Sequence, residues 1–353
     1  MRSTLCKFII FSIAGVLVLS ATAGSAAAKP VTAAELALYQ GADRQQILEE
    51  GARKEGKLTF YTTGILTQSV RPFVDAFKKK YPYIKVEIWR AGTNKLIPRV
   101  MEEISAGRHI VDVIELPQSG QVLLQESQIL QPFYSPNLVH IEKGVIKAAP
   151  GGHAFSVGHW QSGISLGYNT KIISRQALPK THHDLLDPKW KGKIPIPTSG
   201  TGISWAGACF EAYGEEFLKK ASQQNFVAHA ISGRALLDMI IAGEYEFSPT
   251  VFDSHVRKSK SKGAPLDWIP LEPVLCFTDH IMMSKYVAHP HAALLFIDFD
   301  LSKQAGEIYK MNGYNSPRKD VSVEREYKKY HGPFSSDQAK LWNSLFNKYF
   351  LKK

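Results

Sequence analysis

The stretch LTFYTTGILTQSVRPFVDAFKKKYPYIKVEIW, residues 58–89, decides the fold class of this chain. Residues 58–61 form a short apolar run that is typical of a buried strand. Apolar residues at 70, 73, 74 and 77 follow the i, i+3, i+4, i+7 spacing of one helix face, and Pro72 then falls in the first turn. Apolar residues at 84, 86 and 88 alternate, as in a half-buried strand. The stretch therefore predicts a strand, a helix and a second strand.

The same alternation continues on both sides of this stretch. Asp43 is suited to cap a helix that runs through Arg53 and stops at Gly56. Regular alternation of this kind predicts an α/β fold with a mainly parallel sheet and helices on both faces. A chain of 353 residues is long enough for two domains of roughly 150 residues each. Further expected elements are a helix at 96–104 closed by Gly107, a strand at 111–115, a helix at 120–127, a strand at 164–168 and a helix from about Ser204.

Polar loops follow three of the expected strands. They are Thr62-Thr63-Gly64, Gly92-Thr93-Asn94 and the segment from Glu115 onward. Ligands of open α/β sheets bind beyond the carboxyl ends of the strands, and these loops add hydroxyl and amide groups to the N–H donors of the helix starts. A turn of small residues at 198–202 opens a helix in the same way. Ordinary helix capping by each Thr or Asn is the alternative.

The N-terminal segment 1–28 is typical of a secretory signal peptide. Arg2 and Lys7 supply positive charge, residues 8–20 are apolar, and residues 21–28 are small and contain A-x-A sites for cleavage. The apolar run is shorter than the roughly 20 residues that a spanning helix needs. We therefore expect an exported mature chain that begins at about Lys29.

Composition and charge narrow the class of protein. With 44% hydrophobic and 21% charged residues, the chain is neither wholly disordered nor collagen-like. The formal net charge of +11 and the basic clusters 78–80 and 257–262 would suit nucleic acid, but an exported protein rarely meets it, and we expect solvated faces instead. Three cysteines are too few for a disulfide scaffold. Cys209 and Cys276 lie in apolar stretches as buried thiols or, alternatively, as a disulfide.

Motifs for catalysis are missing from the sequence. It contains no G-x-S-x-G, H-E-x-x-H, C-x-x-C, G-x-G-x-x-G or P-loop pattern. The densest metal-like clusters, at 182–184 and 289–291, lack complementary ligands at the usual spacing. We therefore expect a protein that is not an enzyme and that has no cofactor and no resident metal.

The most specific motif is Asp184-Leu-Leu-Asp-Pro-Lys-Trp-Lys-Gly-Lys-Ile194. It resembles a segment of the periplasmic substrate-binding proteins of ABC importers, in the type II group that contains binders of ferric ion, thiamine, phosphonate and sugar phosphate. The resemblance extends over about residues 57–320. Its other motifs are Gly167–Lys171, Pro197–Thr201, His289–Ser302 and Gly313–Arg318.

This resemblance implies two α/β lobes with a hinge and a ligand cleft between them. Lobe one would comprise residues 29–158 with 270–312, and lobe two residues 159–269 with 313–353. The lobes of such proteins close over the ligand by a hinge motion. The resemblance further implies a monomeric periplasmic receptor without catalytic activity, which delivers a small-molecule solute to an ABC permease and ATPase in the inner membrane.

The resemblance does not extend to the iron ligands of the ferric-binding members. Those members use a His in the first loop, a Glu in the third loop and paired tyrosines in lobe two. Here the first loop, Tyr61–Ile65, has no His, Glu115 stands two places early, and Val251-Phe252 replaces the tyrosines. Phenolate oxygens suit Fe(III), whereas Val and Phe offer no ligand atom. Ferric binding is therefore not the favoured function.

The resemblance does imply an anion-binding site in this chain. Segment 199–201 matches the helix start that holds phosphate-like groups, and segment 92–94 matches the facing loop of lobe one. Helix-start N–H groups with hydroxyls favour a carboxylate, phosphate or phosphonate. Trp160, placed just before the crossing strand, and Phe252 are expected to form apolar walls of the site or to belong to the core. Glu115 and Asp253 are expected to accept hydrogen bonds from an amine or hydroxyl of the ligand. Helix capping is the alternative role for Asp253. The predicted ligand-binding residues are Thr62, Thr63, Thr93, Asn94, Glu115, Trp160, Ser199, Gly200, Thr201, Phe252 and Asp253.

Three other functions fit the same fold. They are a receptor for ferric or another metal ion, an enzyme that reuses the two-lobe fold, and a sensor that presents its ligand to a receptor kinase. The sequence does not name the ligand, because its specificity depends on side chains that two lobes bring together.

Overall fold

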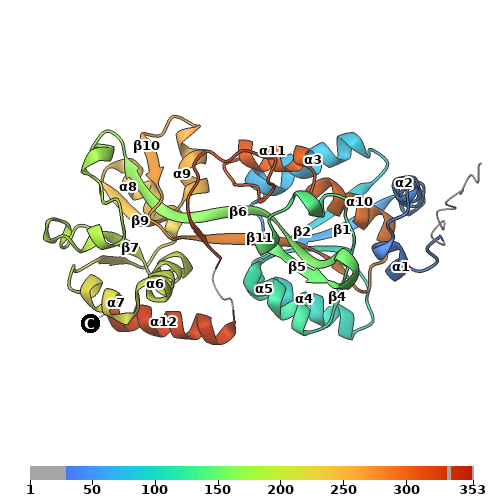
Figure 1. Cartoon of the computed structure of the whole chain (residues 1–353), viewed down its shortest axis with the longest axis horizontal. Coiled ribbons are helices and arrows are strands. Elements are labelled where there is room, and N and C mark those ends of the chain that lie inside the picture. Colours follow the sequence, from blue (N-terminus) through green and yellow to red (C-terminus); the bar gives the residue numbers. More distant parts are fainter. Residues whose placement is uncertain (1–28, 332–334, 352–353) are drawn as a thin grey trace, which may run out of the picture.

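The computed structural model describes residues 29–331 and 335–351. It consists of two α/β lobes that are joined by two long strands, β6 (His153–Asn169) and β11 (Val274–Ser284), which run side by side through the middle of the molecule (Figure 1). The predicted two-lobe α/β fold is thus confirmed. The lobe boundaries stay a prediction. The predicted signal peptide lies outside the described residues, and within them no helix is long and apolar enough to cross a membrane.

Lobe one contains most of the N-terminal elements and two later helices. Strand β1 lies between β2 and β3 in its sheet, and α10 and α11 return to this lobe after β11 (Figure 1). Its elements are α1 (Ala33–Leu38), α2 (Arg44–Glu55), β1 (Lys57–Thr62), a π turn (Leu66–Val70), α3 (Arg71–Lys80), β2 (Lys85–Arg90), α4 (Thr93–Ser105), β3 (Val113–Pro117), α5 (Gln118–Glu126), β4 (Leu130–Gln131), β5 (Ile146–Ala149), α10 (Pro290–Asp300) and α11 (Lys303–Met311).

Lobe two lies at the other end of β6 and β11. Short 3₁₀ turns connect several elements of the chain, among them His183–Leu186 and Pro188–Trp190 within the most specific sequence motif. The elements of lobe two are β7 (Pro195–Pro197), α6 (Gly200–Tyr213), α7 (Glu215–Ser222), β8 (Val227–His229), α8 (Gly233–Ala242), β9 (Phe247–Phe252), α9 (Asp253–Lys260), β10 (Leu266–Ile269) and α12 (Ser336–Phe350), while β12 (Lys329–Tyr330) pairs with β11.

The sheet is mixed, and the prediction of a mainly parallel sheet is wrong. The strand order is β10-β6-β11-β3-β1-β2, and only β1 pairs in parallel with its neighbours β2 and β3 on this path. Strand β11 runs antiparallel to both β3 and β6, and β6 runs antiparallel to β9 and β10. The physical reason is that β6 and β11 cross between lobes in opposite directions, so each of them enters the local sheet against its neighbours. Local alternation in sequence cannot reveal this.

Most local predictions in the N-terminal region are confirmed. Helix α2 ends at Gly56, whose φ of +67° is the left-handed conformation that favours glycine. Pro72 lies in the first turn of α3, as expected. The prediction that Asp43 caps α2 with its side chain is wrong, because its carboxylate instead accepts a hydrogen bond of 2.6 Å from the Tyr39 hydroxyl. Trp160 lies within β6 and not before the crossing strand.

Each lobe has its own hydrophobic core. In lobe one, the rings of Phe73 and Phe77 from α3 pack edge-on against Phe296 from α10, with centroids 4.8 and 5.0 Å apart. In lobe two, α6 and α12 pack together around Trp205 and Phe350. Both Cys209 and Cys276 are buried free thiols, which decides between the two alternatives for them. The largest hydrophobic clusters of the two lobes thus share no residue.

Candidate solute site between the lobes

A cavity of about 680 Å³ lies between the two lobes. Helices α4 and α5 line it from lobe one, α6 and α12 line it from lobe two, and β11 contributes Phe277 and Thr278. Figure 1 shows these four helices on the same side of the crossing strands. Pockets of this size hold organic molecules of metabolite size. The cavity is therefore the candidate ligand site.

Three helix starts converge on this cavity without a side-chain cap. The residues that precede α4, α5 and α6 are Gly92, Pro117 and Ser199, and no side chain of these three accepts a hydrogen bond from its helix. By contrast, Ser232 and Ser302 cap α8 and α11. The first N–H groups of an α-helix have no partner within the helix, and the helix dipole makes this end partly positive. The cavity therefore presents three sets of N–H donors from two lobes.

The carboxylates that line the cavity, Glu126 and Asp337, lie outside the first turns of α4, α5 and α6. The first turns of α4, α5 and α6 contain no acidic residue. The Ser199 hydroxyl oxygen, at the start of α6, is buried and has no hydrogen-bond partner. Such an arrangement of donors favours an anionic group of a ligand.

The structure brings some of the predicted site residues together at this cavity. Thr93 and Asn94 from α4 and Gly200 from α6 all line it. Thr201 is turned toward the start of α8, where its hydroxyl oxygen lies 2.8 Å from the position that a Cβ on Gly233 would take. Only the backbone of Thr201, and not its side chain, is thus placed to serve the helix start.

Glu115 instead organises the first loop. It lies at the end of β3, only 1% exposed. Its carboxylate accepts bonds from the Thr62 hydroxyl, from the Thr63 hydroxyl and N–H at 3.1 Å each, and from the Gly64 N–H at 2.9 Å. Thr62, Thr63 and Glu115 therefore form one cluster, and this cluster fixes the conformation of the loop.

A second buried acid, Asp279 on β11, lies beside this cluster. Burial, together with the charge and hydrogen bond of Glu115, raises the pKa of Asp279 well above its ordinary value. Trp160 is paired with Asp279 in the sheet, and its ring packs on Tyr314 with centroids 4.4 Å apart. Burial and the neighbouring Asp279 raise the pKa of Tyr314 as well. This region of lobe one is a closely bonded acid pair flanked by aromatic rings.

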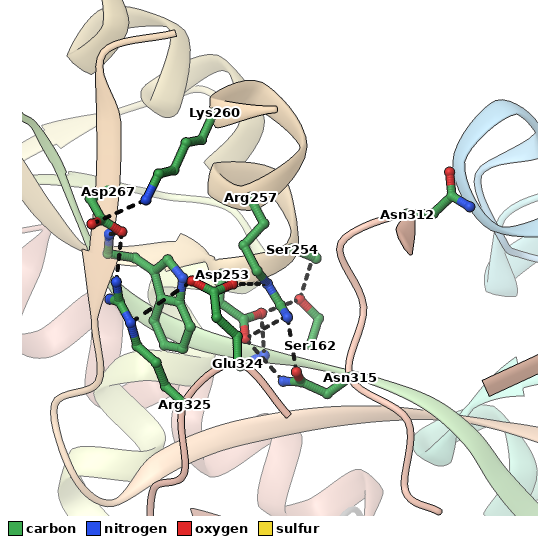
Figure 2. Close-up of polar contacts among 12 residues, drawn as sticks. Ser162, Asp253, Ser254, Arg257, Lys260, Asp267, Asn312, Asn315, Glu324 and Arg325 are labelled. Atoms are coloured by element: carbon green, nitrogen blue, oxygen red, sulfur yellow. Dashed lines mark hydrogen bonds and ion pairs between the residues drawn. The ribbon is translucent and has the colours of Figure 1, made fainter. Parts of the chain in front are cut away.

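Asp253 is enclosed by the protein's own donors (Figure 2). Its side chain is fully buried at the first position of α9 and accepts no hydrogen bond from the backbone of that helix, so the capping alternative is wrong. It accepts hydrogen bonds from five groups, and none of its oxygens is directed to the cavity. These donors are the Ser162 hydroxyl (2.9 Å), the Gly163 N–H (2.9 Å), Arg257 Nη2 (3.0 Å), Asn315 Nδ2 (3.2 Å) and the Tyr327 hydroxyl (3.4 Å).

Phe252 reaches the cavity only through a neighbour. Its ring packs edge-on against Phe277, with centroids 5.4 Å apart, and Phe277 lines the cavity. Phe252 also contacts the ring of His255 at 5.3 Å. Phe252 therefore supports the apolar floor of the cavity.

Sequence reasoning missed the contributions of α5 and α12. Gln118, Gly120 and Asp337 line the cavity near the starts of these helices. The other lining residues stand at 119, 122, 123 and 126 on α5, and at 335, 338, 339, 342 and 343 on α12 and its N-cap. Both sets follow the i, i+3, i+4, i+7 spacing of one helix face. The spacing was visible in the sequence, but it did not reveal that the two faces oppose each other across the lobes. Among the described residues, no group of three or more His, Cys, Asp or Glu is placed to hold a metal ion.

Comparison with known proteins identifies the family. Residues 121–340 match the model of a family described as bacterial extracellular solute-binding protein. The chain belongs to this family. The solute-binding protein is 25% identical, over 257 residues, to a Fe(3+)-binding periplasmic protein of Serratia marcescens, and the match covers 69% of this chain and 73% of the relative. The predicted family, the solute-binding role in ABC importers and the periplasmic location are thereby confirmed.

Solved structures support the type II periplasmic-binding fold. Iron-bound HitA from Pseudomonas aeruginosa has a TM-score of 0.65 at 19% identity, with 83% of this solute-binding protein and 99% of HitA covered. AfuA from Actinobacillus pleuropneumoniae, solved with fructose-6-phosphate, has a TM-score of 0.62 at 19% identity, with 85% of this chain and all (100%) of AfuA covered. At this level of identity the likeness shows the fold and leaves the ligand open.

Proposed function

We propose that this solute-binding protein captures a small organic anion in the periplasm and delivers it unchanged to the permease and ATPase of an ABC importer. The observation that carries the proposal is the convergence of three uncapped helix starts, from both lobes, on one cavity. An anion held there bridges α4 and α5 of lobe one to α6 of lobe two. It therefore stabilises the closed arrangement that a permease can recognise.

The residues take distinct parts in this proposal. Thr93, Asn94, Ser199 and Gly200 surround the anionic group of the solute, while the Glu115 cluster holds the first loop in place. The solute leaves as it came, because donors at helix starts bind an anion without supplying an acid, a base or a nucleophile. We propose that the receptor acts as a monomer, since each chain contains both walls of the cavity.

Ferric ion is the second candidate solute, because the relative from Serratia marcescens carries the name of an Fe(3+)-binding protein. Two observations favour the organic anion over it. The segment 251–252 offers only hydrocarbon side chains, with Val251 fully buried in β9. The cavity of about 680 Å³ is also far larger than a single ion requires.

A thermal-shift screen tests the proposal. We expect small carboxylates, phosphonates or phosphate esters to raise the melting temperature of the protein, because a ligand at 100 times its Kd stabilises by about 2.7 kcal/mol. Fe(III) citrate, Zn(II) and neutral sugars are the comparison set. If only metal ions or neutral sugars raise the melting temperature, the proposal is wrong.

Gly200 allows a sharper test of the same site. No atom lies within 4 Å of the position that a Cβ would take there, so larger side chains fit without strain. Gly200→Asp brings a negative charge to the start of α6, and we expect the affinity for the best anion to fall about tenfold or more. Gly200→Asn is the neutral control of the same shape and keeps most of the affinity. Equal binding by both variants in titration calorimetry would exclude this helix start from the site.

A further inference from the structure

Two helix faces from different lobes oppose each other across the cavity. Helix α5 of lobe one presents Val122 and Leu123, and α12 of lobe two presents Ala339 and Trp342. Leu123 is 45% exposed, which is a large exposure for a leucine that lines a cavity. Ile203 and Phe277 extend this apolar lining between the two helices. Glu126, Asp337 and Gln338 also line this region, but most of the exposed surface of the cavity as a whole is apolar.

The wall formed by α12 is fixed before any solute arrives. Trp342 is only 4% exposed, and Gly207 of α6 permits its ring to lie directly on that helix, because a Cβ at Gly207 would come within 2.0 Å of the ring. The Trp342 indole N–H donates to Glu211 at 3.2 Å, and the Gln338 amide donates to the same carboxylate. With only 4% of its surface exposed, Trp342 backs this wall and offers no open stacking face, and a rigid wall binds a flat group at low entropic cost.

The volume of the cavity calls for more than an anionic group. A water molecule occupies about 30 Å³ of liquid, and an inorganic anion only a few times that volume, whereas the cavity measures about 680 Å³. A bare anion at the helix starts would leave the apolar walls of α5 and α12 in contact with water. A solute with an apolar body removes that surface from water when it binds.

We propose that the solute is an organic anion with a flat apolar body about the size of one aromatic ring. The anionic group lies at the starts of α4, α5 and α6, and the body lies between α5 and α12, against Trp342 and Leu123. Helix α12 thus determines which anions are accepted. This inference rests on the proposed function, since it assigns the chemistry of the remainder of the same solute.

Matched probes test the chemical class of the solute. Methyl phosphate, phenyl phosphate and glucose 6-phosphate share one anionic group, and acetate and benzoate form a second pair. We expect phenyl phosphate to bind at least tenfold more tightly than methyl phosphate, and benzoate more tightly than acetate, in titration calorimetry. If glucose 6-phosphate binds most tightly, or if the small member of each pair binds as well as the aromatic one, the proposal that the solute has an apolar body is wrong. The proposed anion site would be unaffected by that result. If no anion binds, the proposed function fails and this inference fails with it.

Two substitutions on one helix locate the body of the solute. Asn343 lines the cavity and Asn347, one turn farther along α12, does not; both are exposed. Asn343→Trp fills the space between α12 and α5, so we expect at least a tenfold loss of affinity for the aromatic anion and little change for methyl phosphate. Asn347→Trp is the control and changes neither. An equal loss of both ligands in Asn343→Trp would show that the α5 and α12 faces meet each other on closure, which overturns the inference.

Discussion

Helix α9 and helix α6 begin in opposite ways, although both lie in lobe two. Helix α9 starts with Asp253, so its own carboxylate occupies the positive end of the helix and collects donors from β6 and from segment 312–327 (Figure 2). Helix α6 starts with Gly200 after an uncapped Ser199, and its donors face the cavity. The start of α9 thus carries a buried carboxylate of the protein's own, whereas the first turn of α6 carries none. Open donors at a cavity are therefore a better guide to a ligand site than a polar residue type.

The location of the two helix starts explains the difference. The Asp253 network lies beside β6, where Ser162 and Gly163 belong to the crossing strand itself. A fixed connection between α9 and this strand keeps lobe two rigid where the hinge begins. The start of α6 faces the space between the lobes, where a charge of the protein's own would compete with the solute.

The largest effect is expected when the buried carboxylate of Asp253 is removed from the start of α9. Asp253→Ala leaves the Arg257 guanidinium, whose side chain is 9% exposed, without its main buried partner. Losing one partner of a buried ion pair costs about 3–5 kcal/mol, because the remaining charge stays out of water. We expect a fall of this size in the free energy of unfolding, measured by urea denaturation.

Asp238→Ala is the matched control for Asp253→Ala. Asp238 pairs with Arg234 at i, i+4 spacing on α8, but the side chains are 56% and 46% exposed. Exposed pairs of this kind contribute about 1 kcal/mol at most. Equal losses in the two variants would mean that the Asp253 network does not stabilise lobe two beyond an ordinary surface pair.

The order of elements could be predicted from the sequence because it depends on local pattern. Apolar spacing placed α3, α4, α5 and the first three strands within a few residues of their observed bounds. The sheet direction could not be predicted in this way. Gly163 of β6 and Cys276 of β11 are paired in the sheet although they stand 113 positions apart along the chain, so only the tertiary structure shows that they pair. A strand's partners, unlike its existence, depend on the path of the whole chain.

The candidate site could be predicted only in part, for a similar reason. Thr93, Asn94 and Gly200 lie where strands end and helices begin, which is a local feature, and the structure places them at the cavity. Asp253 has the same local signature, yet Ser162 and Asn315, which occupy it, lie 91 and 62 positions away. The wall formed by α12 depends on Gly207 and Glu211 of another helix. Contacts of this range leave no periodic signal in the sequence.

A smaller loss of stability is expected from a substitution where α6 packs against α12. Gly207→Ala places a methyl group against the Trp342 ring, whereas Gly200→Ala on the same helix meets nothing within 4 Å. Overpacking of a buried contact costs about 1–3 kcal/mol. We expect Gly207→Ala to lower the free energy of unfolding by this amount and to weaken solute binding as α12 shifts. Gly200→Ala should leave stability nearly unchanged, and similar values for the two would show that α12 adapts freely to α6.

An effect that depends on pH is expected at the acid pair of lobe one, Glu115 and Asp279. Because the pKa of Asp279 is raised above its ordinary value of 3.8, the folded protein holds a proton that the unfolded chain releases above about pH 4. The stability contributed by this proton is complete below that pH and falls by about 1.4 kcal/mol for each pH unit above it, until the raised pKa is reached. Asp279→Asn does not titrate, and its amide donates to Glu115 as the protonated acid does. The free energy of unfolding of Asp279→Asn should therefore rise relative to that of the parent between pH 5 and pH 7, as measured by urea denaturation at each pH. If this free energy depends on pH in the same way in both proteins, Asp279 is not the group that holds the proton.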